Sequence, residues 1–237
     1  MCVACKGADD ETAVKREAKR IRSSGVRKFI YKSDNEPAII KFKDAVIREL
    51  GPEFEVITET SPEGDSQANG MAESAVRDVQ GMARTLKDSL EVKYKREIPD
   101  DHPITEWMIE YGPAMQNRFS KGKDGLTSYR RRKGKNYSRS LLPFGECVLY
   151  LPVMREKVKK QKKIEAKFNE GIFIGVVDDS DEIIVGTDKG CFRCRTVKRY
   201  RPDMRYQWKM LEGMQGTPSK PIPGEDGHKL HVGLNLE

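Results

Sequence analysis

Residues 26–59 alternate between strand-like and helix-like patterns, and this alternation constrains the fold more than any other feature of the chain. VRKFIY (26–31) and FEVITE (54–59) are β-prone runs. Between them, Pro37 stands where a helix can begin, because its missing N–H costs nothing in a first turn. Apolar side chains follow at helical spacing up to Leu50, and Gly51 ends the helix. A strand–helix–strand order predicts an α/β layer.

Three further helices are predicted around this layer. Residues 9–24 have acidic residues in the first turn, basic residues in the last turn and a glycine stop. After the turn-rich segment 61–70, one apolar and one polar stripe predict a long helix up to about Leu90. Residues 104–119 form another helix, which we expect Gly112-Pro113 to kink or split.

The pattern changes at residue 121. We assign residues 1–120 to an α/β domain and the basic, aperiodic segment 121–142 to a linker. Short apolar runs separated by glycine-containing turns predict a small antiparallel β domain over 143–208. Residues 209–237 are rich in Pro and Gly, so we predict a disordered tail.

Positive charge is concentrated in one part of the chain. Residues 1–120 hold 19 Lys/Arg and 22 Asp/Glu, whereas residues 121–209 hold 23 Lys/Arg and 11 Asp/Glu. Such a local excess is typical of proteins that bind a polyanion, so we expect DNA as a partner. No run approaches the roughly 18 apolar residues of a membrane span, and we expect no membrane partner.

Five cysteines include two C-x-x-C pairs, Cys2/Cys5 and Cys191/Cys194, which are compatible with zinc ligands. The second pair lies in a strand-like run, where residues three apart point to opposite faces. No histidine lies near either pair in the sequence. We therefore favour unpaired cysteines over a zinc site.

Two carboxylates stand where a metal site would need them. Asp34 follows the first predicted strand, and Glu73 lies at the start of the long helix. Two-metal phosphoryl transfer requires acids that converge from different elements of a rigid sheet. Taken alone, each acid is explained as well by stabilisation of a helix N-terminus.

The sequence around these acids resembles the second and third catalytic blocks of retroviral-type integrases. KSDNEPA (32–38) resembles the block with the second metal-binding Asp, and SPEGDSQANGMAE (61–73) resembles the N-G-x-x-E loop with the metal-binding Glu. Two later segments resemble the corresponding parts of integrases from copia-like LTR retrotransposons. They are LTSYRRRKGKNYSRSLLPFGECVLYL (126–151) and EGIFIGVVDDSDEIIVGTDKGCFRCRTVKR (170–199). The resemblance spans about residues 7–208.

The resemblance implies a partial RNase H-like core followed by an SH3-like antiparallel β domain. It implies Asp34 and Glu73 as catalytic ligands of Mg²⁺ (or Mn²⁺), with Asn69 and Gly70 shaping the active-site loop. In such integrases, metal-activated water trims a DNA end, and the new 3′ hydroxyl attacks a target phosphodiester. The family's first catalytic Asp lies on an earlier strand, but only 33 residues precede Asp34. We therefore expect an N-terminally truncated integrase that is inactive alone.

If the resemblance holds, basic residues of the long helix and of two later runs contact DNA phosphates. Tyr129 and Tyr137 are candidates for stacking on bases or sugars. A solvated linker or a nuclear-import signal explains the runs as well, and DNA integration itself requires a nuclear location. The candidate residues are Arg77, Arg84, Lys87, Arg130, Arg131, Arg132, Lys133, Lys135, Lys159, Lys160, Lys162 and Lys163.

Two other functions remain open. The chain is a non-catalytic DNA-binding remnant if only the basic segment and β domain act. It is a peptide-binding module if the β domain exposes an aromatic cluster, but we expect Tyr150, Phe173 and Phe192 to be core residues. Self-association into a homo-oligomer is also left open.

Overall fold

A computed structural model of the chain describes residues 7–60, 70–152, 167–225 and 229–232. They belong to two compact units, and each is described here by itself. Unit 1 contains the residues up to 80 and residues 121–136, whereas unit 2 contains residues 81–120 and those from 137 onward. This division differs from the predicted domain boundary at residue 120, because residues 81–120 cluster with the later sheet.

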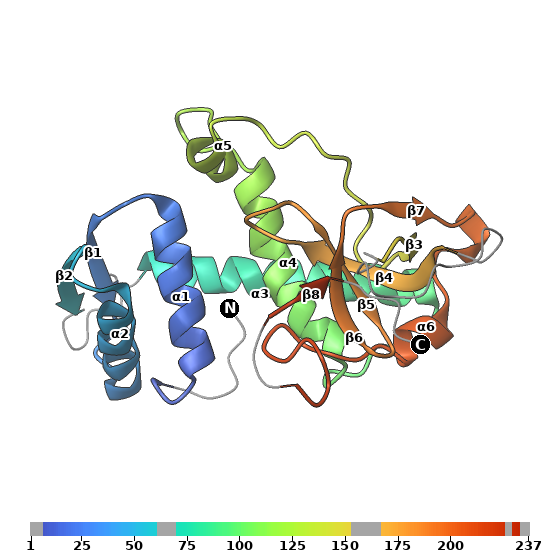
Figure 1. The fold of residues 1–237 in the computed structure, drawn as a ribbon, viewed down its shortest axis with the longest axis horizontal. Coiled ribbons are helices and arrows are strands. Elements are labelled where there is room, and N and C mark those ends of the chain that lie inside the picture. The colour runs from blue at the N-terminus through green and yellow to red at the C-terminus, as the bar shows by residue number, and fades with distance from the viewer. Residues whose placement is uncertain (1–6, 61–69, 153–166, 226–228, 233–237) are drawn as a thin grey trace, which may run out of the picture. The chain divides into compact units, whose positions relative to one another are not determined.

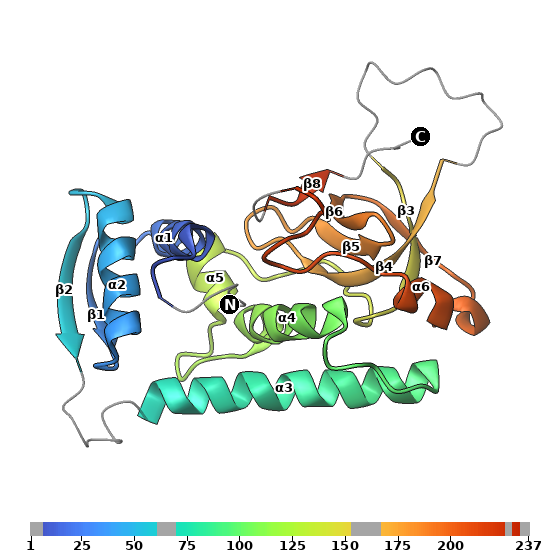
Figure 2. The same ribbon diagram turned by 90° about the horizontal axis from the view of Figure 1, so that it is seen from below.

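Unit 1 is a small α/β layer, as the strand–helix–strand pattern predicted. Strands β1 and β2 pair in parallel, with Lys28 opposite Glu55 and Ser33 opposite Thr60. The helices α1 and α2 lie on the same side of this two-stranded sheet (Figures 1 and 2). The elements are α1 (Glu11–Ser24), β1 (Lys28–Ser33), α2 (Pro37–Leu50), β2 (Glu55–Thr60) and the start of α3 (Gly70–Tyr94).

One face of this sheet forms the core of unit 1. Phe29, Tyr31 and Val56 point from the strands toward the helices. The helices contribute buried residues to the same cluster, and Ala18 and Val46 are fully enclosed. The alternating burial of β1 follows from this one-sided packing, because successive side chains point to opposite faces of a strand.

Unit 2 contains a six-stranded sheet in the order β7-β3-β4-β5-β6-β8. The first five of these strands are antiparallel, as predicted for the β domain, while β8 is parallel to β6. The helix α4 (Pro103–Phe119) packs against β4. The strands are β3 (Cys147–Tyr150), β4 (Asn169–Val176), β5 (Ile183–Thr187), β6 (Gly190–Cys194), β7 (Val197–Arg199) and β8 (His231–Val232).

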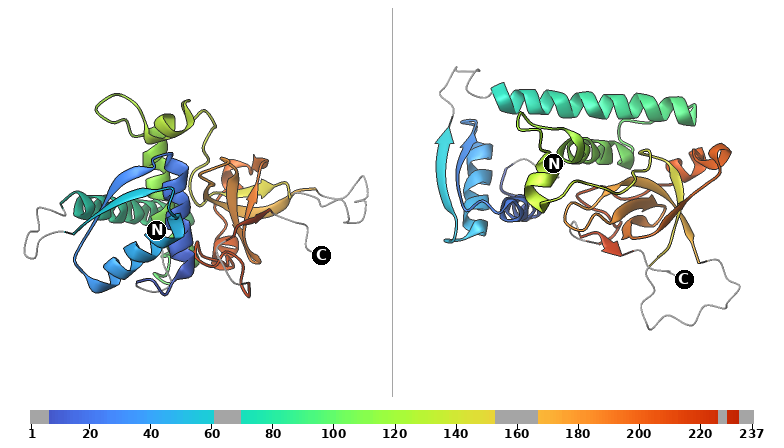
Figure 3. Two further views of the ribbon diagram at one scale, coloured as in Figure 1. Left: turned by 60° about the vertical axis from the view of Figure 1, so that its left-hand side comes forward. Right: turned by 90° about the horizontal axis from the view of Figure 1, so that it is seen from above.

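Both faces of the large sheet are buried. Ile172 and Cys191 pack in one cluster with Trp107 of α4, whereas Phe173 and Cys194 pack in a second cluster on the other face. The prediction that Cys191 and Cys194 point to opposite faces is confirmed. Leu90 and Tyr94, from the end of α3 that belongs to unit 2, join the first cluster, and Figure 3 shows α4 near these strands.

Aromatic residues of the β domain are core residues, as predicted. Tyr150 and Phe192 are each 4% exposed, and Phe173 is 1% exposed. The structure therefore gives these three rings no role as an exposed peptide-binding cluster.

Two expectations about regular structure differ from the structure in part. The helix α4 continues through Gly112-Pro113 and is therefore not split there, because packing of its buried residues outweighs the loss of one backbone hydrogen bond. The predicted disordered tail from residue 209 is incorrect for the described part. There, α6 (Trp208–Glu212) buries Leu211, Met214 is 1% exposed, and the Cys191 N–H donates to the Pro221 carbonyl at 2.7 Å.

Candidate functional site

Asp34 lies at the carboxyl edge of the β1–β2 sheet. The parallel register places Ser33 opposite Thr60, so both strands end at the same edge. Asp34 follows β1 directly and is exposed. The Asn35 N–H donates to Asp34 Oδ1 at 2.7 Å, and this bond orients the carboxylate. Ligands collect at this edge in open α/β sheets.

Glu73 lies in the first turn of α3 and is exposed. The strand β2, the last described element before α3, ends at Thr60, which lies opposite Ser33. Gly70 is the first residue of α3, whereas Asn69 lies outside the described residues. The parallel strands therefore bring Asp34 and the end of β2 to one edge of the sheet, while residues 61–69, between β2 and α3, lie outside the described residues.

Carboxylate oxygens such as those of Asp34 and Glu73 suit Mg²⁺, which binds through a few carboxylates and keeps much of its water. The donor chemistry of the pair therefore fits the predicted cation. Among the residues that the structure describes, no three or more His, Cys, Asp or Glu side chains gather in a way that could hold a metal ion.

The cations predicted on α3 differ in how they are compensated. Arg77 and Arg84 are exposed. Lys87 instead contacts Asp100 and lies 3.9 Å from Glu91. The hydrogen bond that Lys87 Nζ donates to Asp100 raises the pKa of Lys87 and lowers the pKa of Asp100. The positive charge of Lys87 is thus compensated by two acidic neighbours, whereas a phosphate-binding lysine needs its charge available to the ligand.

The basic segment after residue 121 was predicted to be aperiodic, but it contains the short helix α5 (Ser128–Lys133). Lys121 and Thr127 form an antiparallel bridge before it. The Arg130 N–H donates to Thr127 Oγ1 at 3.0 Å, and Gly134 closes the helix in the left-handed conformation. This cap pair, together with good helix formers between its members, explains a helix in a segment without an apolar stripe.

Most predicted DNA-binding cations of this segment are exposed. Arg130, Arg131, Arg132 and Lys135 are exposed, and Lys133 is half-buried. Arg131 pairs with Asp124 at 2.5 Å, but both side chains remain about half exposed. Lys159, Lys160, Lys162 and Lys163 lie outside the described residues. We call the exposed set Arg130, Arg131, Arg132 and Lys135 the α5 basic cluster.

The predicted stacking role of Tyr129 was wrong. Tyr129 is only 3% exposed, so its ring is not accessible to a base. Tyr137 is half-buried, and its ring packs edge-on against Phe119 with the Arg118 guanidinium 5.4 Å from its centre. Both tyrosines of this basic segment pack against other parts of the protein. Their burial could not be predicted, because the sequence around them has no apolar periodicity.

The β domain also contains many arginines, but buried carboxylates engage several of them. Glu146 is fully buried and accepts two bonds of 2.7 Å from Arg199. Glu182 accepts from Arg195 at 3.0 Å and Arg193 at 3.1 Å. Burial raises the pKa of Glu182. The hydrogen bonds from Arg195 and Ser180 and the charge of Arg193 together have a larger, opposite effect, so the pKa of Glu182 lies below its ordinary value. Part of the positive charge of the β domain is therefore compensated by these carboxylates.

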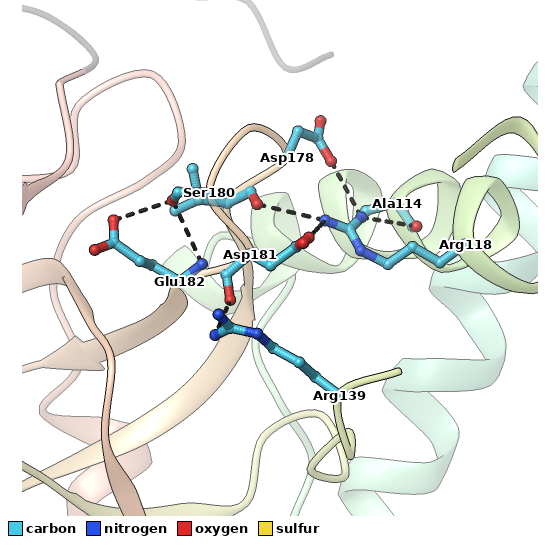
Figure 4. Close-up of polar contacts among 8 residues, drawn as sticks. Ala114, Arg118, Arg139, Asp178, Ser180, Asp181 and Glu182 are labelled. Atoms are coloured by element: carbon cyan, nitrogen blue, oxygen red, sulfur yellow. Dashed lines mark hydrogen bonds and ion pairs between the residues drawn. The ribbon is translucent and has the colours of Figure 1, made fainter. Parts of the chain in front are cut away.

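One polar cluster was not predicted from the sequence. Arg118 of α4 is 1% exposed in its side chain and contacts Asp178 at 3.1 Å and Asp181 at 3.3 Å (Figure 4). Arg139 donates to the Asp181 carbonyl at 2.9 Å. These contacts fix the β4–β5 turn against α4. Since the partners are 60 and 63 residues apart in the chain, no local pattern could have indicated them.

No helix in the described ranges has the length and apolar character needed to cross a bilayer. In comparisons with known proteins, no protein-family model and no curated protein matched the chain.

Proposed function

We propose that this chain is a DNA-binding protein of the retrotransposon-integrase type. In this proposal, unit 1 is part of an RNase H-like catalytic core and the large sheet of unit 2 belongs to an SH3-like β domain. Asp34 and Glu73 supply two ligands for Mg²⁺ or Mn²⁺, and the protein acts in the nucleus. The observation that carries the proposal is the parallel pairing of Ser33 with Thr60: β1, which precedes Asp34, and β2, the last described strand before Glu73, end at the same edge of the sheet.

The chemistry follows from what each residue offers. Mg²⁺ bound between carboxylates would lower the pKa of a water molecule and neutralise charge on a phosphodiester. Asp34, oriented by the Asn35 N–H, would bind the cation from the strand end. Glu73 would bind it from the first turn of α3. Because the integrase resemblance includes only two of three acids, we expect the chain alone to bind DNA without strand transfer.

Metal binding tests the carboxylate assignment. In Mn²⁺ titrations followed by electron paramagnetic resonance, Asp34→Asn and Glu73→Gln should each weaken Mn²⁺ binding by about tenfold or more, as loss of a charged ligand implies. A matched control is Glu53→Gln, an exposed acid that the proposal does not use. Equal Mn²⁺ affinity in all four proteins would exclude Asp34 and Glu73 as ligands. Strand transfer by the chain alone on end-mimicking DNA would show that two acids suffice.

DNA binding tests the α5 basic cluster. Affinity for a short duplex, measured by fluorescence anisotropy, should fall steeply with salt. Replacing Arg130 and Lys135 by Gln should reduce the slope of log K against log salt by about 2, since each phosphate contact contributes about 0.9. The matched control replaces Lys15 and Arg201, which are exposed but paired with Glu11 and Asp203. An identical loss of slope in both double variants would assign binding to net charge rather than to the cluster.

A second candidate function is DNA binding without catalysis. It is favoured by the exposure of the α5 basic cluster, which does not include either carboxylate. It predicts that Glu73→Gln and removal of divalent cations leave DNA affinity unchanged. A fall in affinity in either case would favour the metal-dependent proposal.

A further inference from the structure

The β1–β2 sheet has one face that neither α1 nor α2 covers. Lys28, Ile30 and Lys32 alternate with the core residues of β1 and are exposed. Glu55, Ile57 and Glu59 are the exposed residues on the same face of β2. Ile30 is 57% exposed and Ile57 is 47% exposed. Parallel sheets are usually covered on both faces, so a parallel sheet with one exposed face that carries two isoleucines is unusual.

The charges on this face are arranged in two columns of opposite sign. The register pairs Lys28 with Glu55, Ile30 with Ile57 and Lys32 with Glu59. The strand β1 therefore presents positive, apolar and positive side chains, while β2 presents negative, apolar and negative side chains in the same rows. Lys28 and Glu55 already form an ion pair at 2.5 Å.

This pattern is self-complementary for one arrangement of two copies. A two-fold axis parallel to the strands, midway between two stacked sheets, places β1 of one copy over β2 of the other. Each lysine then faces a glutamate, and each isoleucine faces an isoleucine. Sheets stack about 10 Å apart with nearly aligned strands, which lets such side chains meet. A two-fold axis across the strands instead places lysine over lysine and is disfavoured.

We propose that this bare face of the β1–β2 sheet pairs with the same face of a second copy of the chain. The interface is isologous, so each contact occurs twice. The two isoleucine pairs form its centre, and two rows of alternating Lys and Glu flank them. The occupant is a second copy because the face complements itself in both charge and apolar position, and this argument does not depend on the proposed DNA function.

The expected association is weak. Six side chains on two short strands bury less than the roughly 800 Å² per partner of a standard stable interface. We therefore expect a dissociation constant in the micromolar range or weaker, at about 1 μM or above. Dimers should accumulate at high protein concentration without DNA.

Charge reversal tests the proposal, with sedimentation velocity as the measurement. Lys28→Glu with Lys32→Glu makes the face wholly acidic, and Glu55→Lys with Glu59→Lys makes it wholly basic. Each double variant alone should associate at least tenfold more weakly than the unaltered chain. An equimolar mixture of the two should form a heterodimer, because the acidic face then meets the basic one.

The fourfold exchange of all these charges restores the pattern with its columns swapped. It should dimerise about as well as the unaltered chain. The ion pair between positions 28 and 55 is kept, with the acidic and basic residues exchanged. Circular dichroism of each variant establishes that unit 1 is folded. Ile30→Thr with Ile57→Thr, which keeps strand-forming residues, should weaken association at least tenfold.

The outcomes are decisive in both directions. A monomer at every concentration, or a dimer that ignores these variants, would overturn the proposal. So would a mixture of the acidic and basic variants that fails to associate while both are folded. Because the measurements contain no DNA or metal, their failure leaves the proposed function untouched, and failure of DNA binding leaves this interface untouched.

Discussion

In both sheets of this protein, the burial pattern of a strand is the one usually found in the other kind of sheet. The antiparallel strand β4 has six consecutive buried residues at its C-terminal end, whereas the parallel strand β1 alternates exposed and half-buried residues. Parallel strands usually show the continuous apolar pattern and antiparallel strands the alternating one. The number of covered faces, rather than the strand direction, therefore decides the burial pattern of a strand.

The reason lies in what packs on each face. Unit 2 places Trp107 and Met108 of α4 on one side of its sheet and a second apolar cluster on the other. A register shift between Phe173 and Gly175 helps, because the bulge lets Val176 join the same cluster as Phe173. In unit 1, α1 and α2 cover one face only. Stability should therefore depend strongly on strand residues in unit 2 and weakly on outward residues in unit 1.

Two isoleucines in the middle of strands should differ most in how much they contribute to the free energy of unfolding. Ile172 is 1% exposed and Ile30 is 57% exposed. Ile172→Ala should lower the free energy of unfolding of unit 2 by about 3–4 kcal/mol, because it removes buried methyl groups and leaves a cavity. Ile30→Ala should change that of unit 1 by about 0.5 kcal/mol or less.

Both tryptophans, Trp107 and Trp208, belong to unit 2, so their fluorescence in urea reports on that unit. Hydrogen exchange of β1 and β2 amides reports on unit 1. Similar losses for both variants would break the distinction between a two-sided and a one-sided sheet.

A smaller effect is expected from the buried ion pairs of unit 2. Arg118→Met leaves Asp178 and Asp181 without their buried partner, and this should cost about 2–3 kcal/mol. The value is below the 3–5 kcal/mol for wholly buried pairs, since Asp178 is partly exposed. The control is Arg131→Met, whose pair with Asp124 is about half exposed and should contribute about 0–1 kcal/mol. Tryptophan fluorescence in urea measures the first, and hydrogen exchange of α5 the second.

If Arg118→Met unfolds no more easily than the unaltered chain, the cluster in Figure 4 does not hold the β4–β5 turn. If Arg118→Met does lower the free energy of unfolding, the double variant with Asp181→Asn tests whether the loss comes from a carboxylate left without its arginine. Removing the acid together with the arginine should recover part of the loss, because the less exposed of the two carboxylates is then replaced by a neutral amide.

Glycines with the same conformation separate backbone strain from packing. Gly145 and Gly134 have φ of 75° and 71°, which L side chains rarely adopt. A Cβ at Gly145 would lie 2.5 Å from Leu90, whereas a Cβ at Gly134 meets nothing within 4 Å. Gly145→Ala should therefore cost about 2 kcal/mol and Gly134→Ala about 1 kcal/mol. Equal losses, measured by urea unfolding of unit 2 and hydrogen exchange of α5, would show that Leu90 moves aside freely.

The sequence predicted local structure well where one physical cause dominated. Pro37 and Gly51 bound α2 at the expected residues, because each acts on its own backbone. The positions of Asp34 directly after β1 and of Glu73 in the first turn of α3 were also predictable. Arg118 and Glu146 were not, because their partners are distant in the chain and become neighbours only in the packed fold. Similarly, Leu211 and Met214 gave no periodic signal, yet a pre-existing apolar cluster buries them.

The smallest expected effect concerns pH and a histidine that connects α4 to α6. His102 Nδ1 accepts from the Ile104 N–H at 3.1 Å, and Nε2 lies 2.9 Å from the Leu211 carbonyl, so the neutral ring with a proton on Nε2 satisfies both contacts. Burial lowers the pKa of His102, although the Leu211 carbonyl and Asp101 act in the opposite direction.

Because the folded pKa is below the unfolded value of 6.5, the unfolded chain takes up the proton more readily. The stabilisation is therefore complete above this value and is lost as the pH falls through the folded pKa. Urea midpoints from tryptophan fluorescence should decrease slightly between about pH 7.5 and about pH 5.5. His102→Asn keeps a side-chain oxygen for the Ile104 N–H and removes the titration, so its midpoint should vary less with pH. An equal pH dependence in the Asn variant would show that titration of His102 does not cause the effect.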